Sequence, residues 1–344
     1  MAQVVAICGR TAEKTHEMAQ RWNVPQVFTD AEVMIRDANL DGIVVASSNE
    51  SHYAITMRAL NAGLHVLCEK PLALTYTQAK AMADLAAAKG VKHLVPFTYA
   101  YMPVNRYIKQ LVDEGFIGKP YHLNLRYYAS YGRKTDYVWR FDARRAGSGA
   151  VGDIGSHFMY LARWWFGPRV GEITEVSCMT GNLVERALLD PSGQPYPLTD
   201  DTSATLLRFA SGAQAVIHAT TVAWEGTPFG QTHHAELHGS EGTLYGFCDW
   251  DAVQRVSGAK AGQGAVQPMP IPDSIWGDAR RDTAHNTYRD VFRKQNFMAR
   301  EWVNAIANDL PIKPDFGDGA AIQRVIEAAL KSANEQRVVG LNEI

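Results

Sequence analysis

The sequence has few cysteines, no long hydrophobic run and almost no net charge, and each absence excludes a class of protein. Its four cysteines form no CxxC pair and no disulfide framework, which predicts reduced thiols in a cytoplasmic protein. No apolar run approaches the length of a transmembrane helix, and the first ten residues lack the pattern of a cleavable signal. A net charge of -2 and a pI near 6.6 give no general attraction to nucleic acid or anionic membranes. Neither partner is therefore expected.

The chain has 344 residues, a length that suits two domains. In the first hundred residues, short runs rich in Val, Ile and Leu alternate with helical patterns. The predicted strands are Val4–Cys8, Gly42–Ala46, Leu64–Cys68 and His93–Phe97, and the predicted helices are Thr11–Arg21, Asp30–Arg36, His52–Ala62 and Thr75–Lys89. This order predicts a doubly wound parallel sheet, a Rossmann-like α/β domain over residues 1–100. Asp30 and Thr75 are expected to cap the helices that they begin.

The pattern changes after residue 120, where longer runs alternate between apolar and polar residues. Alternation of this kind is typical of an open, mainly antiparallel sheet with one covered face, here in a second domain over residues 101–344. The predicted strands are Tyr121–Tyr131, Ile173–Thr180, Thr205–Phe209, Ala213–Thr221, His234–His238 and Thr243–Phe247. Helices are expected over Val151–Phe166, Arg289–Asn308 and Gly319–Asn334, and an irregular loop over Ser257–Pro272.

The stretch Leu67–Ala73 ends an apolar strand with Glu69 and Lys70, and Pro71 then fixes the turn. Ligands of open α/β sheets bind outside the carboxyl ends of the strands, so Lys70 stands where a ligand is expected. The structural alternative, a surface lysine in a turn, is about equally consistent with the spacing.

A second stretch, Gly147–His157, reads GSGAVGDIGSH. If it opens a helix, Asp153 and His157 lie on one face, where a carboxylate can orient an imidazole that takes a proton from an alcohol. The structural alternative is a helix-capping acid beside a core histidine.

Taken together, these stretches resemble the glucose-fructose oxidoreductase and inositol dehydrogenase family (Gfo/Idh/MocA) over nearly the whole chain. The family's EKP strand matches Glu69–Pro71, and its T-P-N-x-x-H loop is similar to Ser47–His52. Further counterparts are Ala62–Val66, Glu114–Pro120 and Trp139–Asp142. The resemblance implies a nicotinamide-dependent dehydrogenase that acts on a sugar or polyol.

The resemblance also implies roles for individual residues. Lys70, Asp153 and His157 would be the catalytic trio, with His157 as acid/base and Lys70 stabilising the reacting oxygen. Substrate contacts are expected from the trio together with Tyr99 and Tyr128, and Tyr101 and Tyr131 are further candidates to line a sugar site. Cofactor contacts are expected from Gly9, Arg10, Thr11, Ser47, Ser48, Asn49, His52, Glu69, Lys70, Trp139 and Arg140. No metal is expected.

The chain departs from the family at its start, where no GxGxxG turn follows the first strand. Val4–Cys8 instead resembles the family's second strand, so the first βα unit is expected to be missing. Three interpretations stay open: a misplaced starting methionine, a shift of Val4–Cys8 into the central position, or a protein that does not bind dinucleotide in the usual way. Gly9 stands where NAD enzymes of the family usually carry an acid, and Arg10 follows it, which favours NADP over NAD because arginine can bind a 2′-phosphate.

Other functions and assemblies also stay open. A glycosidase or lyase of similar fold would oxidise its sugar only transiently, and a non-catalytic relative would bind sugar without turnover. His234, Glu236 and His238 share one face of a strand, which suits zinc, but a partly exposed sheet face is the favoured interpretation. The family resemblance implies a homodimer or homotetramer formed through the second domain's sheet.

Overall fold

The computed structural model describes residues 2–224 and 230–344, which form two compact units. Unit 1 comprises residues 1–96 and 299–320, and unit 2 comprises residues 97–298 and 321–344. The sequence pattern placed one boundary near residue 100 but did not indicate that residues 299–320 return to unit 1. Within the described residues, no helix is long and apolar enough to span a membrane.

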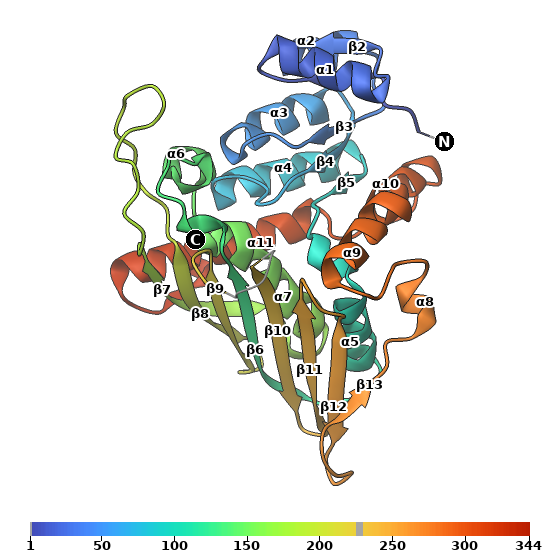
Figure 1. Ribbon diagram of the computed structural model, residues 1–344, viewed down its shortest axis with the longest axis vertical. Helices are drawn as coiled ribbons and strands as arrows, with labels where there is room; N and C mark the ends of the chain where they lie inside the picture. The colour runs from blue at the N-terminus through green and yellow to red at the C-terminus, as the bar shows by residue number, and fades with distance from the viewer. Residues whose placement is uncertain (1, 225–229) are drawn as a thin grey trace. The chain divides into compact units, whose positions relative to one another are not determined.

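Unit 1 contains five parallel strands in two separate sheets (Figure 1). The first sheet pairs β1 (Ala6–Cys8) with β2 (Gln26–Phe28), and the second has the order β3 (Gly42–Val45), β4 (His65–Cys68), β5 (His93–Leu94). The helices are α1 (Ala12–Trp22), α2 (Ala31–Asp37), α3 (Asn49–Asn61) and α4 (Tyr76–Lys89). Asp30 accepts from two backbone amides of α2 and Thr75 from one of α4, which confirms both predicted caps.

The two sheets of unit 1 each end at a strand with a single neighbour. Within residues 2–224 and 230–344, β1 pairs only with β2, and β3 pairs only with β4. The strand at Val4–Cys8 therefore does not occupy the central position between the two sheets, which was one of the predicted alternatives. Val44 of β3 is 57% exposed and all three residues of β1 are half-buried. These strands are less covered than the interior strands of a parallel sheet usually are.

Unit 2 is built on a nine-stranded mixed sheet. Its order is β13-β12-β11-β10-β6-β9-β8-β7-β14, and every neighbouring pair is antiparallel except β6 and β9. The strands are β6 (Pro120–Ala129), β7 (Ile173–Gly181), β8 (Thr202–Phe209), β9 (Gln214–Thr220), β10 (Gln231–Gly239), β11 (Gly242–Asp249), β12 (Arg255–Lys260), β13 (Gln267–Met269) and β14 (Val339–Gly340). The predicted α/β class, with a parallel first domain and a large open sheet in the second, is confirmed.

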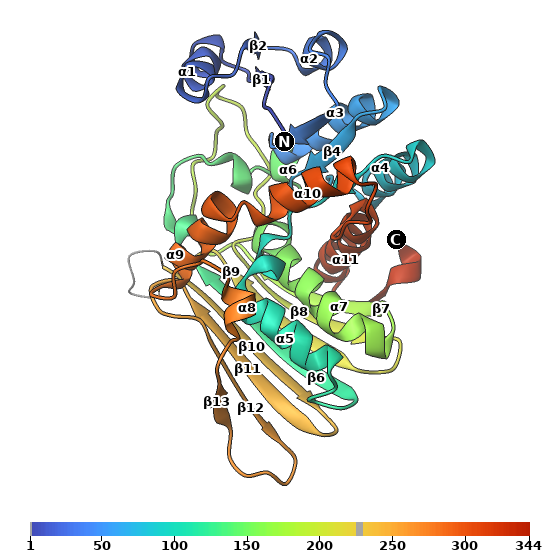
Figure 2. The same ribbon diagram turned by 90° about the vertical axis from the view of Figure 1, so that its right-hand side faces the viewer.

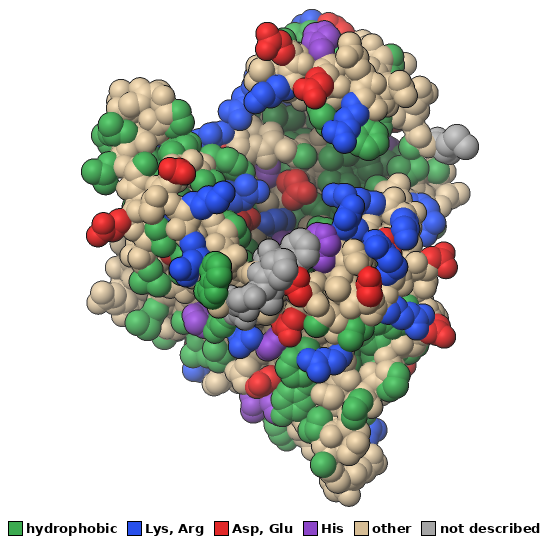
Figure 3. Space-filling view, in the orientation of Figure 1, with side chains coloured by type: hydrophobic (Ala, Val, Ile, Leu, Met, Phe, Trp, Pro, Cys, Tyr) green, Lys and Arg blue, Asp and Glu red, His purple; other side chains and the backbone are tan. Residues whose placement is uncertain are grey.

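One face of this sheet is covered by helices. Figures 1 and 2 show α5 (Pro103–Asp113) and α7 (Ser156–Val170) on the same side of the strands. Burial alternates along β8, so that Leu207 is fully buried while its neighbour Leu206 is 43% exposed. Figure 3 views the uncovered side, where histidine and hydrophobic side chains lie among Lys and Arg. One sheet face is therefore core and the other is open.

The remaining helices are α6 (Ala143–Ala146), α8 (Asp273–Trp276), α9 (Ala284–Arg289), α10 (Phe297–Ala307) and α11 (Phe316–Glu335). The helix predicted over Arg289–Asn308 is interrupted, because a π-helical turn at Asp290–Lys294 and Asn296 with φ 50° separate α9 from α10. The loop predicted over Ser257–Pro272 is confirmed for residues 261–266 and 270–272, but the rest of this range belongs to β12 and β13. Its glycines and alanines hid these two strands, of which β12 pairs with both β11 and β13.

Asp290, which is 1% exposed, ties α9 to the segment before it. Its carboxylate accepts from the backbone amide and Nε of Arg280 through Oδ2, and from Nη2 through Oδ1. The Arg280 guanidinium holds the pKa of Asp290 well below its usual range. A lowered folded-state pKa gives stability that is present above the unfolded pKa and lost as the pH falls.

We expect Asp290→Asn to lower the free energy of unfolding by about 1–3 kcal/mol at pH 7. The difference in unfolding free energy between the wild type and the variant should shrink below about pH 4, where the Asp290 carboxyl of the wild type takes up a proton on unfolding. Urea titrations of both proteins across pH 3–8 measure this difference. A difference that is constant over this range would contradict the role of the Asp290 charge.

Candidate active site

Asp153 and His157 lie at the start of α7, as predicted, but the helix opens with a π-helical turn. This turn, Val151–Gly155, runs directly into Ser156–Val170. The side chain of Asp153 is 22% exposed, whereas His157 is 5% exposed. A carboxylate open to small molecules thus lies one turn before a nearly buried imidazole. Short π-helical segments of this kind are frequent at functional sites.

The carboxylate of Asp153 is held by two side chains from the preceding segment. Tyr131 Oη donates to Asp153 Oδ2 at 2.5 Å, and Arg140 Nε lies 3.4 Å from the same oxygen. Arg140 belongs to the short helical turn Trp139–Phe141, and its guanidinium lies over the Trp139 ring. Trp139 and Arg140 were predicted to contact the cofactor, and the structure brings Arg140 to Asp153. Tyr131, a sequence candidate for lining a sugar site, hydrogen-bonds Asp153, a contact that the sequence did not predict.

The imidazole of His157 borders a buried aromatic cluster. Its ring centroid is 4.4 Å from that of Tyr99, whose hydroxyl bonds Tyr127 Oη at 2.6 Å and accepts from Gln231 Nε2 at 2.9 Å. Burial raises the pKa of both tyrosines well above the usual range, so both stay neutral. His233 joins the cluster, and burial lowers its pKa to about 3, so it is an uncharged imidazole. His157 is therefore bordered on this side by uncharged rings.

Tyr128 was predicted to contact substrate, and the structure places it on the open face of the sheet. Successive side chains of a strand point to opposite faces, and Tyr127 occupies the buried face against Phe158 of α7. The hydroxyl of Tyr128 bonds His218 Nδ1 at 2.7 Å, on the open face. A substrate contact of Tyr128 stays a prediction.

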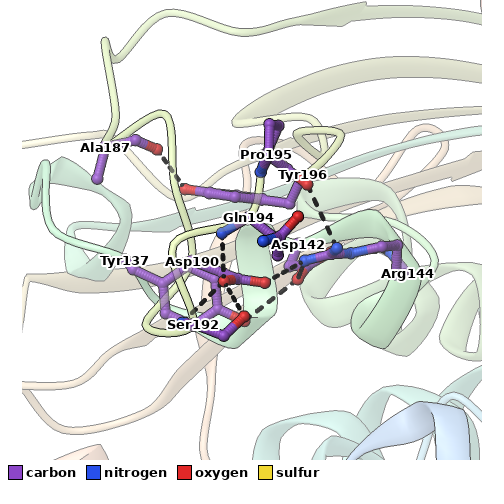
Figure 4. A network of polar contacts seen from close by, with 9 residues as sticks. All are labelled: Tyr137, Asp142, Arg144, Ala187, Asp190, Ser192, Gln194, Pro195 and Tyr196. Atoms are coloured by element: carbon purple, nitrogen blue, oxygen red, sulfur yellow. Dashed lines mark hydrogen bonds and ion pairs between the residues drawn. The ribbon is translucent and has the colours of Figure 1, made fainter.

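A polar network fixes the segment that carries Arg140 (Figure 4). Arg144 donates to Asp142 Oδ2 and to Asp190 Oδ2, at 2.7 and 2.8 Å, and so joins residues 137–144 to residues 187–196. Asp142 is fully buried and also accepts from Tyr137 Oη at 3.2 Å. The hydrogen bond from Arg144 is the main cause of the lowered pKa of Asp142. Arg140 thus extends from a backbone that is anchored on both sides.

In unit 1, Glu69 and Lys70 directly follow β4, at the carboxyl end of a parallel strand. Both are half-buried, and the Lys70 amide donates to Glu69 Oε2 at 3.1 Å. His52 of α3 is fully buried. Its Nδ1 faces Pro71 O at 3.0 Å and its Nε2 faces Ser47 O at 3.1 Å. The ring of His52 therefore bridges the loops at Ser47 and Pro71, the two predicted cofactor loops. Both of its nitrogens face backbone carbonyls of the protein.

The other predicted cofactor residues lie at the carboxyl ends of β1 and β3. Arg10 and Thr11 are exposed, and Gly9 packs so closely on Thr15 that a Cβ would lie 2.5 Å from its Oγ1. Ser47 is exposed, Ser48 is half-buried and Asn49 begins α3. These loops fit one end of a dinucleotide, since they present hydroxyl, carboxylate and ammonium groups where α/β sheets bind ligands.

The pyrophosphate half has a weaker fit. Within the described ranges, no glycine-rich turn follows a parallel strand. Gly147–Gly152 has the spacing GxGxxG, but the amides of Gly149 and Val151 are bound to the Asp200 carboxylate, each at 2.8 Å. The amides of that turn are therefore already hydrogen-bonded to a carboxylate of the protein and do not offer a phosphate site.

The histidines of β10 have protein partners rather than a shared metal geometry. His234 Nε2 lies 2.8 Å from Asp249 Oδ1, and His238 Nδ1 lies 2.9 Å from Thr243 Oγ1. In the part of the chain that the structure describes, no group of three or more His, Cys, Asp or Glu residues is arranged to hold a metal ion.

Comparison with known proteins places these features in a family. Residues 1–97 match the oxidoreductase family with an NAD-binding Rossmann fold, and residues 105–245 match the GFO/IDH/MocA C-terminal domain. The chain belongs to the Gfo/Idh/MocA oxidoreductase family, and it is an NAD-binding-type oxidoreductase whose relatives are sugar and polyol dehydrogenases.

The chain is 26% identical to levoglucosan dehydrogenase of Pseudarthrobacter phenanthrenivorans, over 96% of this chain and 88% of the relative. A levoglucosan dehydrogenase structure in complex with NADH and levoglucosan has a TM-score of 0.84 and 26% identity, over 98% of this chain and 90% of that chain. An oxidoreductase domain protein from Kribbella flavida has a TM-score of 0.83 and 28% identity, over 98% and 90% of the two chains.

Proposed function

We propose that the protein transfers hydride between a nicotinamide cofactor and a secondary hydroxyl of a sugar, anhydrosugar or polyol. The observation that carries this proposal is the arrangement around α7. A partly exposed carboxylate with a defined orientation stands one turn before an imidazole bordered by uncharged rings. A carboxylate can bind a polyol hydroxyl, and an imidazole near neutral pKa can take the proton of the reacting one.

In this proposal, each residue acts on a stated atom. His157 takes the proton from the substrate hydroxyl, Asp153 binds and orients the substrate, and the Lys70 ammonium stabilises charge on the same oxygen. The proton passes to His157, the hydride leaves the carbon with two electrons, and the alcohol becomes a ketone. The nicotinamide, when bound, supplies the hydride acceptor. Ser47, Ser48 and Glu69 would hold its ribose end.

The cofactor preference is proposed from Arg10, which is exposed at the carboxyl end of β1. A guanidinium can bind a 2′-phosphate through two parallel hydrogen bonds. We expect calorimetry to show tighter binding of NADP⁺ than of NAD⁺, and Arg10→Ala to weaken NADP⁺ binding about 10- to 100-fold. Arg21→Ala, at the far end of α1, is the matched control.

Each outcome of the calorimetry has one meaning. Tighter binding of NAD⁺ would reject the role of Arg10, and failure of a folded sample to bind either dinucleotide would reject the proposed function for this chain. Net NAD(P)H formation with polyols then distinguishes a dehydrogenase from a lyase or glycosidase, which would return the hydride to its substrate.

We also propose a homo-oligomer formed through the open face of the nine-stranded sheet. Leu206 and Val216, on neighbouring strands of this face, are 43% and 42% exposed, and Arg208 is exposed beside them. A second copy of the same face would cover these side chains. Sedimentation of the wild type and of Leu206→Glu tests this, since the substitution should shift the protein toward monomer.

A further inference from the structure

The contact between Tyr131 and Asp153 has a defined direction. Tyr131 is 38% exposed, and partial burial together with the Asp153 charge raises the pKa of its hydroxyl well above the usual range. The phenol therefore stays protonated at neutral pH. It donates its proton at 2.5 Å, and Asp153 Oδ2 accepts it. Charge-assisted hydrogen bonds of this type are roughly twice as strong as neutral ones.

The backbone at Tyr131 is fixed by its neighbours. Gly132 N donates to Thr221 O at 2.8 Å, and a Cβ on Gly132 would lie 2.1 Å from Thr221 Oγ1. Arg186 Nη2 donates to Gly132 O at 2.7 Å, and Thr221 N donates to Asp201 O at 2.9 Å. Arg186 also pairs with the Asp201 carboxylate, and both side chains are 1% exposed. Asp201 thus holds the Tyr131 turn through two independent paths.

The backbone at Asp153 is fixed by Asp200, the residue directly before Asp201 in the chain. Asp200 accepts from Gly149 N through Oδ1 and from Val151 N through Oδ2, and Ala150 N donates to Asp200 O at 3.0 Å. Asp153 N in turn donates to Gly149 O at 2.8 Å. A Cβ on Gly149 would lie 1.8 Å from Asp200 O, so the approach needs glycine. The two adjacent acids therefore place the two ends of the Tyr131–Asp153 hydrogen bond.

We propose that Tyr131 is a positioning residue of the reaction, which holds the Asp153 carboxylate in one orientation, and that the Asp200–Asp201 pair fixes both partners. This inference rests on the proposed function, because it assigns to Tyr131 an effect that acts through Asp153. Misplacement of a substrate-binding group by about 1 Å can lower the rate about 100-fold without loss of the fold.

The test compares Tyr131→Phe with Tyr107→Phe, which removes a tyrosine hydroxyl from α5, outside the contacts of Asp153 and Arg140. Tyr131→Phe should lower kcat about 10- to 100-fold and leave the dinucleotide Kd unchanged, while Tyr107→Phe should change neither. The double variant Tyr131→Phe/Asp153→Asn should be no slower than Asp153→Asn, because both changes remove the same interaction. Wild-type kcat in Tyr131→Phe, or full additivity of the two changes, would overturn the proposal.

A second measurement does not depend on turnover. In proton NMR of the full chain, the Tyr131 hydroxyl should give a downfield resonance that is lost in Tyr131→Phe, shifted in Asp153→Asn and kept in Tyr107→Phe. Asp200→Asn, which turns an amide NH₂ toward a backbone N–H, should also shift it. Absence of the resonance from the wild type overturns the proposal. If the resonance behaves as expected but no polyol is oxidised, the proposed function fails and the hydrogen bond stands.

Discussion

Replacing Lys70 by alanine is expected to lower kcat by about 10²- to 10⁴-fold with a sugar or polyol substrate, while the protein stays folded. The ammonium group would stabilise negative charge that develops on the reacting oxygen, and alanine supplies nothing in its place. The backbone should tolerate the change, since Lys70 is half-buried and lies in the turn after β4, outside the sheet.

The matched control for Lys70 is Lys80→Ala on α4. Lys80 is exposed and pairs with Asp84 at i,i+4, so its loss should leave the fold and kcat unchanged. Steady-state kinetics, dinucleotide calorimetry and thermal melts of the three proteins separate catalysis from binding and folding. Unchanged turnover in Lys70→Ala would remove Lys70 from the mechanism.

The sequence predicted the fold where local chemistry and periodicity agree. The strands β3 and β4 are short apolar runs bounded by turns, and the caps of α2 and α4 are side chains that accept from their own helix amides. The strand β12 was missed because Gly258 and Ala259 carry no apolar alternation. Its place is set by backbone pairing with Leu244 and Thr243 of β11, the strand before it in the chain, rather than by its own side-chain pattern.

The candidate site was predicted in part for the same reason. Motif spacing located Asp153 and His157 at one helix start, but it could not show that Tyr131 or Arg140 reaches Asp153 across segments of irregular backbone. Alternation along β6 puts Tyr127 and Tyr128 on opposite faces, but the sequence alone does not show which of the two faces is buried. The contacts of Asp200 join residues about fifty positions apart, and no local pattern encodes them.

Replacing Arg186 by alanine is expected to lower the free energy of unfolding by about 3–5 kcal/mol. The guanidinium pairs with Asp201, lies 3.5 Å from the centroid of the Phe141 ring and donates to the carbonyls of Gly132 and Lys134. Alanine leaves a buried carboxylate without its counter-charge and two carbonyls without a donor. The exposed pair of Arg281 and Asp273 is the control, and Arg281→Ala should cost about 0–1 kcal/mol.

The size of the Arg186 effect depends on the charge left behind, which a second substitution can remove. Asp201→Asn in the Arg186→Ala background should recover part of the lost stability, although each single change is destabilising. Urea unfolding of the four proteins measures this coupling. Additive losses would mean that the pair acts through packing on Phe141 rather than through charge. Where Arg186→Ala still folds, its kcat should be lower than that of the wild type, as we expect for Tyr131→Phe. The reason is that the Arg186 guanidinium holds the Gly132 carbonyl beside Tyr131.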